Sequence, residues 1–266
     1  MASTGSTISA LKRPIAAVGS ATINFFSRVG SMSLITWEVL KSTRFIFRDR
    51  NLYIRQALEI GVASLPLVLM IGAFTGAVST WQTNYTAGDM LPLKYMGVAT
   101  FKAVLIELGP VLAGLVLAGR VGSSLAAQLA TMRVTEQVDA LEVLAVDPIR
   151  YLVAPRMVSA VVMVPVLVTL AVFMAMWGGF LVANLFMNVG FDLYFGEIPV
   201  FFKMKDVNVM LIKSATFGGI IAMNGTYIGM SAKGGAEGVG KATIRSFVFS
   251  ALGILVMDYV LATILF

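Results

Sequence analysis

Residues 157–186 read MVSAVVMVPVLVTLAVFMAMWGGFLVANLF and contain no charged side chain. A helix needs about 20 mainly apolar residues to cross the hydrocarbon core of a bilayer, and this run exceeds that length. The rest of the chain is similar, since 58% of its 266 residues are hydrophobic and only 13% are charged. A soluble domain of this length needs far more charged surface. The sequence therefore predicts an all-α integral membrane protein.

Other apolar segments lie on both sides of this run, so we predict about five transmembrane helices. The further segments are 60–82, 100–125, 207–231 and 244–266. Pro66 and several glycines interrupt the first of them, which either crosses the bilayer or turns back within it as a re-entrant segment. No internal repeat is visible. We expect one transmembrane domain over residues 60–266.

The region before this domain, residues 1–59, is basic and amphipathic. Apolar side chains recur on one face of 8–30, a pattern typical of a helix that lies in the membrane interface. Eight lysines and arginines precede residue 60, whereas the loop 83–99 has only Lys94. Because basic segments stay in the cytoplasm, we predict a cytoplasmic N-terminus and, after five spans, an external C-terminus. A re-entrant first segment would reverse the orientation of everything after it.

The connection between the second and third spans predicts a short amphipathic helix over 131–146, which Pro148 ends. Such a helix either rests on the membrane surface or docks into a partner protein. An acidic face is unfavourable beside an anionic leaflet, but the residues alone leave both interpretations open. Its apolar face holds Val134, Val138, Leu141 and Ala145, and its acidic face holds Glu136, Asp139 and Glu142.

Four charged residues lie well inside the predicted spans, where each is costly and a functional candidate. Glu107, Lys213 and Asp258 share one layer in the outer half of the membrane when a rise of about 1.5 Å per residue is assumed. Spans four and five are antiparallel neighbours, so we predict an ion pair between Lys213 and Asp258; a substrate or gating role is the alternative. Glu107 has no partner on its own helix. We expect Arg120 to reach the inner headgroups, in a structural or phosphate-anchoring role.

The chain has no cysteine and no histidine, which removes thiolate metal sites, the commonest metal ligand and the commonest general base. Residues 235–242 read GAEGVGKA and nearly match a phosphate-binding loop, but Ala242 replaces the hydroxyl residue and the segment lies between two spans. We predict no catalytic residue, no metal and no cofactor bound by this chain. The net charge of +6 indicates basic segments facing anionic lipid, not nucleic acid.

Several segments resemble the MlaE/YrbE-type permease family, the membrane subunits of ABC phospholipid transporters that work with MCE-domain proteins. The resemblance covers about residues 10–266 and is densest between 107 and 156. It is carried by ELGPVLAGLVLAGRVGSS from Glu107, by MRVTEQVDAL from Met132, and by AVDP and APR, which end at Pro148 and Arg156.

This resemblance implies a permease subunit of the bacterial inner membrane that acts as a homodimer with its C-terminus in the periplasm. A cytoplasmic ATPase subunit would bind ATP and Mg²⁺ and would contact the 131–146 coupling helix. Phospholipid would pass to a periplasmic MCE-domain protein, which maintains the lipid asymmetry of the outer membrane. Glu107 would face the lipid cavity, with Gln82, Trp81 and Val78 as further cavity residues. The coupling residues would be Glu136, Gln137, Asp139, Ala140 and Leu141.

Two other classes of protein remain as alternatives. An ion-coupled secondary transporter of an amphipathic substrate favours internal repeats and polar groups at the midplane of the membrane. A membrane enzyme would need an acid and a base, for which Glu107 and Asp258 are the candidates. Copurification of an ATPase argues against the first class, and turnover of lipid without ATP would indicate the second.

Overall fold

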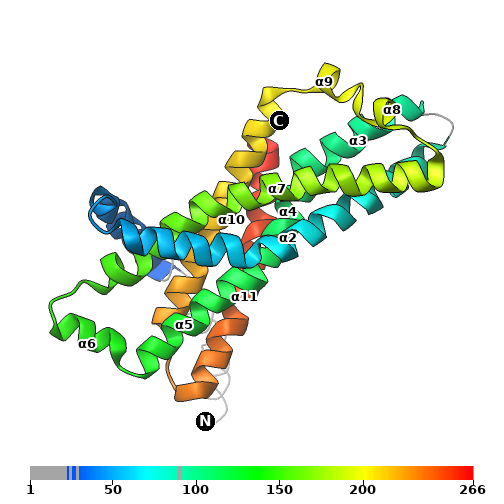
Figure 1. Ribbon diagram of the computed structural model, residues 1–266. Coiled ribbons are helices and arrows are strands. Elements are labelled where there is room, and N and C mark those ends of the chain that lie inside the picture. The colour runs from blue at the N-terminus through cyan, green and yellow to red at the C-terminus, as the bar shows by residue number, and fades with distance from the viewer. Residues whose placement is uncertain (1–22, 24–25, 28–29, 89–91, 266) are drawn as a thin grey trace, which may run out of the picture.

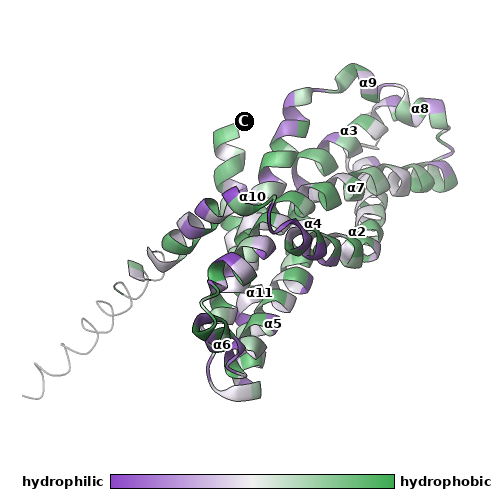
Figure 2. Cartoon of the chain, turned by 60° about the vertical axis from the view of Figure 1, so that its left-hand side comes forward, coloured by the Kyte–Doolittle hydropathy of each residue, from purple (hydrophilic) through white to green (hydrophobic). Residues whose placement is uncertain are grey.

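The computed structural model describes residues 23, 26–27, 30–88 and 92–265, all in helices, turns and short loops (Figure 1). Five helical runs in this part of the chain are long and apolar enough to cross a membrane, which confirms the all-α membrane fold. Figure 2 shows hydrophobic residues along these long helices. The five runs are Arg50–Thr86, Leu93–Val134, Ile149–Met187, Met204–Met230 and Gly235–Leu265.

The first span is a single helix, α2 (Arg50–Ala87), which continues through Pro66. At 1.5 Å per residue its 38 residues extend about 57 Å, more than enough to cross the bilayer. The segment therefore does not turn back on itself. The helix also includes residues 50–59, which the sequence assigned to the interfacial region.

Helix α7 (Ala154–Met187) runs beside α2 along most of its length (Figure 1). Small residues form the seam, because a side chain on Gly72 or Gly76 would meet the backbone of α7 at Ala171 or Ala175. Gly178 in turn faces the backbone of Ala73. Such steps let two membrane helices approach to backbone contact, where dispersion replaces the missing hydrophobic driving force.

The second span is built from α3 (Met96–Ala103), α4 (Gly109–Leu117) and α5 (Ser123–Val134), joined by two π-helical turns. The turns cover Val104–Leu108 and Ala118–Gly122. Pro110 has no N–H to donate to the preceding turn, which explains the irregular hydrogen bonding there. Glu107 and Arg120 each lie in one of these turns, and π-helical turns are frequent at functional sites.

Helix α10 (Met204–Met230) packs against α7, α5 and α11 (Gly235–Leu265). Most of α11 is exposed, and its buried residues are Ala242, Ser246, Ser250 and Ile254. Ser246 donates a 2.9 Å hydrogen bond to the carbonyl of Gly122 in a π-helical turn of the second span. The fifth span therefore attaches by a narrow polar and small-residue face, while its apolar face is left for lipid or another chain.

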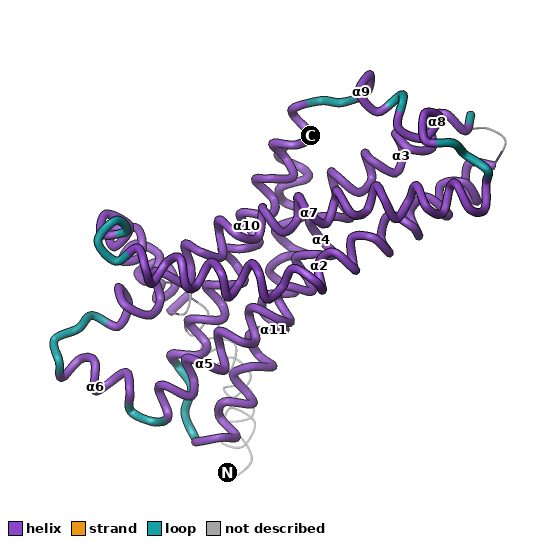
Figure 3. Tube along the Cα trace, in the orientation of Figure 1, coloured by secondary structure: helices purple, strands orange, loops and turns teal. Residues whose placement is uncertain are grey.

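Short helices close the two ends of the bundle (Figure 3). Helix α6 (Gln137–Val143) lies at one end, and α8 (Phe191–Phe195) and α9 (Ile198–Phe201) lie at the other. At the α8 end Tyr194 is fully buried, and burial raises the pKa of its phenol. Its hydroxyl lies 3.0 Å from that of Thr80, which lies 3.0 Å from Thr100. The loop is thus fastened to α2 and α3.

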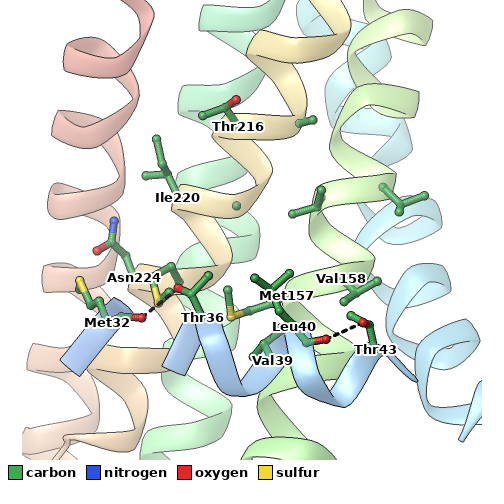
Figure 4. Close-up of a pocket in the computed structure, with 15 residues that line it drawn as sticks. Met32, Thr36, Val39, Leu40, Thr43, Met157, Val158, Thr216, Ile220 and Asn224 are labelled. Carbon is green, nitrogen blue, oxygen red and sulfur yellow. Dashed lines mark hydrogen bonds between the residues drawn. The ribbon is translucent and has the colours of Figure 1, made fainter. Parts of the chain in front are cut away.

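An N-terminal helix over 30–42 lies across α10 and α7 (Figure 4). Its Val39 is buried, and an apolar cavity of about 700 Å³ separates part of the helix from the two spans. The turn between this helix and α2 is held by an ion pair, in which Asp49 lies 2.6 Å from Arg150, just before α7. Most of the interfacial helix predicted over 8–30 lies outside the described residues.

The connection after the second span differs from the single helix predicted over 131–146. Helix α5 runs on to Val134, and α6 begins only at Gln137. Glu136 between them takes a left-handed conformation, with φ of 59°, which interrupts helical hydrogen bonding. Helix α6 ends at Val143, several residues before Pro148, so the proline does not terminate it.

Candidate functional site

Two cavities lie on the side of α2 that faces the second span. The one in the half of the bundle nearer α8 is apolar, is open to one side and measures about 730 Å³; we call it the groove. Residues of α2 at helical spacing form one wall, and Ala103, Leu108 and Leu112 form the other. The α2 wall consists of Phe74, Thr75, Val78, Ser79, Gln82, Thr83 and Thr86. An apolar wall with hydroxyl and amide groups toward one end suits an amphipathic ligand.

Toward the α6 end, the same side of α2 borders a smaller and more polar cavity of about 310 Å³. There Arg120 donates a 3.1 Å hydrogen bond to Ser64 of α2. Gln128 donates a 2.6 Å bond to Glu59, which ties α5 to α2 a second time. The charged groups of this smaller cavity are therefore engaged between helices, and the apolar groove lies toward the opposite end of α2.

The structure divides the four residues predicted for the cavity, of which Glu107 is described with the charged residues below. Val78 and Gln82 line the groove, and Val78 is 66% exposed. Gln82 donates a 3.0 Å hydrogen bond to Thr86, one turn further along α2. Trp81 is not among the lining residues; its ring packs edge-on against Phe186 of α7, with 5.5 Å between centroids. The helical period that brings Val78 and Gln82 together turns Trp81 toward α7.

Three of the four intramembrane charges form one cluster across three spans. The Lys213 ammonium, whose side chain is fully buried, lies 2.6 Å from Glu107 and 2.8 Å from Asp258. Asp258 is mostly buried, whereas the Glu107 side chain is 43% exposed. Glu107 is not among the residues lining the groove, and its partner belongs to a neighbouring helix. Paired, hydrogen-bonded groups are the form in which charges persist at membrane depth.

The α6 end presents the residues that the sequence assigned to coupling. Glu136, Gln137, Asp139 and Ala140 are exposed, while Leu141 is half-buried and packs with Val138 beneath the helix. Asp139 also pairs with Arg133. The sequence analysis missed two exposed apolar side chains that follow, Val143 at 87% and Leu144 at 72%. Their exposure can be recognised only once α6 is known to end at Val143.

The segment 235–242, which nearly matches a phosphate-binding loop, forms the first turns of α11. Within it Lys241 pairs with Glu237 at 2.5 Å, one helical turn away. A phosphate-binding loop instead wraps its ligand between a strand and a helix. Across the described residues there is no group of histidine, cysteine, aspartate and glutamate suited to a metal ion.

Together these features define a multi-pass membrane permease: five spans, a lateral groove along one of them, and an exposed helix at one end of the bundle. The chain belongs to the MlaE permease family, whose model, described as "Permease MlaE", matches residues 53–264. The family resemblance carried by residues 107–156 is thereby confirmed.

Relatives cover nearly the whole chain. A probable ABC transporter permease protein of Rickettsia felis is 41% identical, over 94% of this chain and 96% of that protein. The intermembrane phospholipid transport system permease protein MlaE of Haemophilus influenzae is 31% identical, over 95% and 97%. The chloroplastic protein TRIGALACTOSYLDIACYLGLYCEROL 1 of Arabidopsis thaliana is 32% identical, over 80% of this chain and 61% of its own length.

Proposed function

We propose that this permease moves phospholipids between the inner membrane and periplasmic MCE-domain carriers, and so maintains the lipid asymmetry of the outer membrane. The observation that carries the proposal is the 730 Å³ groove beside α2, which is apolar along its walls and open to one side. The name of the Haemophilus influenzae relative, an intermembrane phospholipid transport permease, supports this substrate class.

The groove suits the two parts of a phospholipid. Its apolar walls, which include Phe74, Val78 and Leu112, would receive acyl chains. Gln82 and Thr86 at the α8 end would meet the headgroup by hydrogen bonds. A groove open on one side encloses a lipid only when another surface covers it, and a second copy of the chain would do so in a homodimer.

Energy would come from a separate ABC ATPase that binds ATP and Mg²⁺. The exposed surface of α6, with Glu136, Val143 and Leu144, would be its docking site. Helix α6 follows the second span after a two-residue turn, so a displacement of α6 would move the wall of the groove. This is coupling between two sites through one mobile element.

The basic segments support an orientation in the inner membrane with the α6 end and the N-terminus in the cytoplasm. Lys233 lies in the turn between α10 and α11, and Lys241 and Arg245 lie in the first three turns of α11, at the opposite end from α8. The C-terminus and the α8–α9 loop would then face the periplasm, where MCE-domain carriers operate.

The test is reconstitution of the permease with its ATPase in proteoliposomes, followed by ATP-dependent transfer of labelled phospholipid to the MCE-domain protein. Val78→Trp would fill the groove, and we expect it to reduce transfer about tenfold or more. Val166→Trp on α7 is the matched control, because its side chain is 45% exposed within a span and lies outside the groove. Transfer driven by an ion gradient, with no ATPase present, would instead indicate a secondary transporter.

A further inference from the structure

The turn between α10 and α11 contains a cavity of about 400 Å³ that is separate from the α2 groove. Helix α10 contributes Tyr227 and Ile228, and the turn after it contributes Ser231 and Lys233. Helix α11 contributes Lys241, Arg245 and Phe249 at spacings of four residues, so these three lie on one face. We call this cavity the basic pocket.

The basic pocket carries an excess of positive charge. Lys241 is paired with Glu237. Neither Lys233 nor Arg245 has an ion-pair partner among the described residues, and both are exposed. Three cations against one carboxylate leave two positive charges at one rim, with the Tyr227 ring in the wall. Arginine and lysine at such a rim favour a phosphate group.

An exposed apolar stripe continues from the pocket along α11. Phe249, Leu252, Val256 and Val260 follow Arg245 at helical spacing and are 46%, 54%, 65% and 39% exposed. From Arg245 to Val260 the stripe extends about 22 Å at 1.5 Å per residue. Arg245 is also the last charged residue of α11 before Asp258, so the pocket lies at headgroup depth and the stripe lies among acyl chains.

From this arrangement we infer that the basic pocket and the α11 stripe together bind an anionic phospholipid of the leaflet at the α6 end. The phosphate lies against Lys233 and Arg245, and the acyl chains lie along Phe249 and Leu252. Cations at headgroup depth directly above exposed apolar side chains match both halves of such a lipid. A soluble phosphate compound would contact only the cations of the basic pocket and not the apolar stripe. The inference concerns a lipid held on the surface of α11 and does not depend on the proposed transport.

The experiment uses the full chain in mild detergent and native mass spectrometry of bound phosphatidylglycerol and phosphatidylcholine. We expect the wild-type chain to retain phosphatidylglycerol preferentially. The combined substitutions Lys233→Gln, Lys241→Gln and Arg245→Gln should weaken that binding about tenfold or more, since each unpaired basic residue near the surface contributes about fivefold and Lys241 is already paired with Glu237. All three side chains are exposed, so the fold should persist.

The matched control replaces Arg48, Arg50 and Arg55 by glutamine, which removes the same charge from exposed positions near the start of α2. It should keep the preference for phosphatidylglycerol, as should the charge-conserving variant Lys233→Arg, Lys241→Arg, Arg245→Lys. Equal losses in the control and the pocket variant would overturn the inference, because the binding would then follow net charge alone. Displacement of the lipid by millimolar inorganic phosphate would also overturn it and would indicate a site for free phosphate.

Discussion

Lys213 of α10 donates a 2.6 Å hydrogen bond to Glu107, a residue 106 positions earlier in a π-helical turn of the second span. The same ammonium lies 2.8 Å from Asp258 of α11. One buried cation therefore holds three spans together, and two carboxylates share it. The Glu107 side chain, 43% exposed, is the member of the cluster most open to its surroundings.

Replacing Lys213 by methionine should destabilise the protein strongly. The substitution leaves Glu107 and Asp258 without their common cation at membrane depth, and the loss of one partner from a buried ion pair costs on the order of 3–5 kcal/mol. We expect a large fall in the melting temperature of the detergent-solubilised protein. Fluorescence-detected size exclusion after heating would measure that temperature.

The single variants Glu107→Gln and Asp258→Asn serve as controls for that prediction. Each leaves Lys213 one carboxylate, so each should cost only about 1 kcal/mol. The double variant leaves the ammonium unpaired and should be as unstable as Lys213→Met. If the loss of stability in the double variant only equals the sum of the two single losses, the three residues do not act as one cluster.

The sequence predicted the common layer of these charges and the pair between Lys213 and Asp258, but not the contact between Glu107 and Lys213. Counting residues along each span placed Glu107, Lys213 and Asp258 at one depth, and antiparallel order made Lys213 and Asp258 neighbours. The lateral position of the second span depends on packing against α10 and α11, which no single helix encodes. The Glu107–Lys213 contact was for that reason outside the reach of the sequence.

The coupling region shows a similar limit. An apolar face containing Val138 and Leu141 was readable from their spacing, and both pack against the bundle. The break at Glu136 was not readable, because a left-handed glutamate has no distinct sequence signal. Helical periodicity places Val78 and Gln82 on one face of α2 and Trp81 on another. Which of these faces meets the second span is known only from the structure.

Close packing between α2 and α7 predicts that alanine substitutions at two glycines will differ sharply in their effect on stability. Gly76→Ala would place a methyl group against the carbonyl of Ala175, so the helices would have to separate. Overpacking of this kind costs on the order of 1–3 kcal/mol. Gly119→Ala, also in a span, would meet only ordinary contacts with Phe247 and should be neutral or slightly stabilising. Thermal stability in detergent would show whether the two substitutions differ.

Tyr194 should govern how firmly the α8 end is closed. Tyr194→Phe removes the hydroxyl beside Thr80 but leaves the Thr80–Thr100 contact, so the loss should be about 1 kcal/mol. Because the ring still fills its cavity, this loss should fall on local opening of the loop, and the melting temperature should change little. Hydrogen exchange of residues 188–203 should accelerate about fivefold, while α7 keeps its protection. Unchanged exchange in this loop would mean that aromatic packing alone fastens it.

The exposed apolar pair after α6 should matter for ATPase binding and not for folding. Val143 and Leu144 are 87% and 72% exposed, so replacing both with aspartate removes no core contact. Desolvated apolar anchors supply much of the energy of protein interfaces, and we expect copurification of the ATPase subunit to fall at least about tenfold. Val200→Asp, at the opposite end of the bundle and 75% exposed, is the matched control and should retain the subunit. Full retention by the α6 variant would place the ATPase contact on another surface, since two carboxylates cannot be buried there without a large cost.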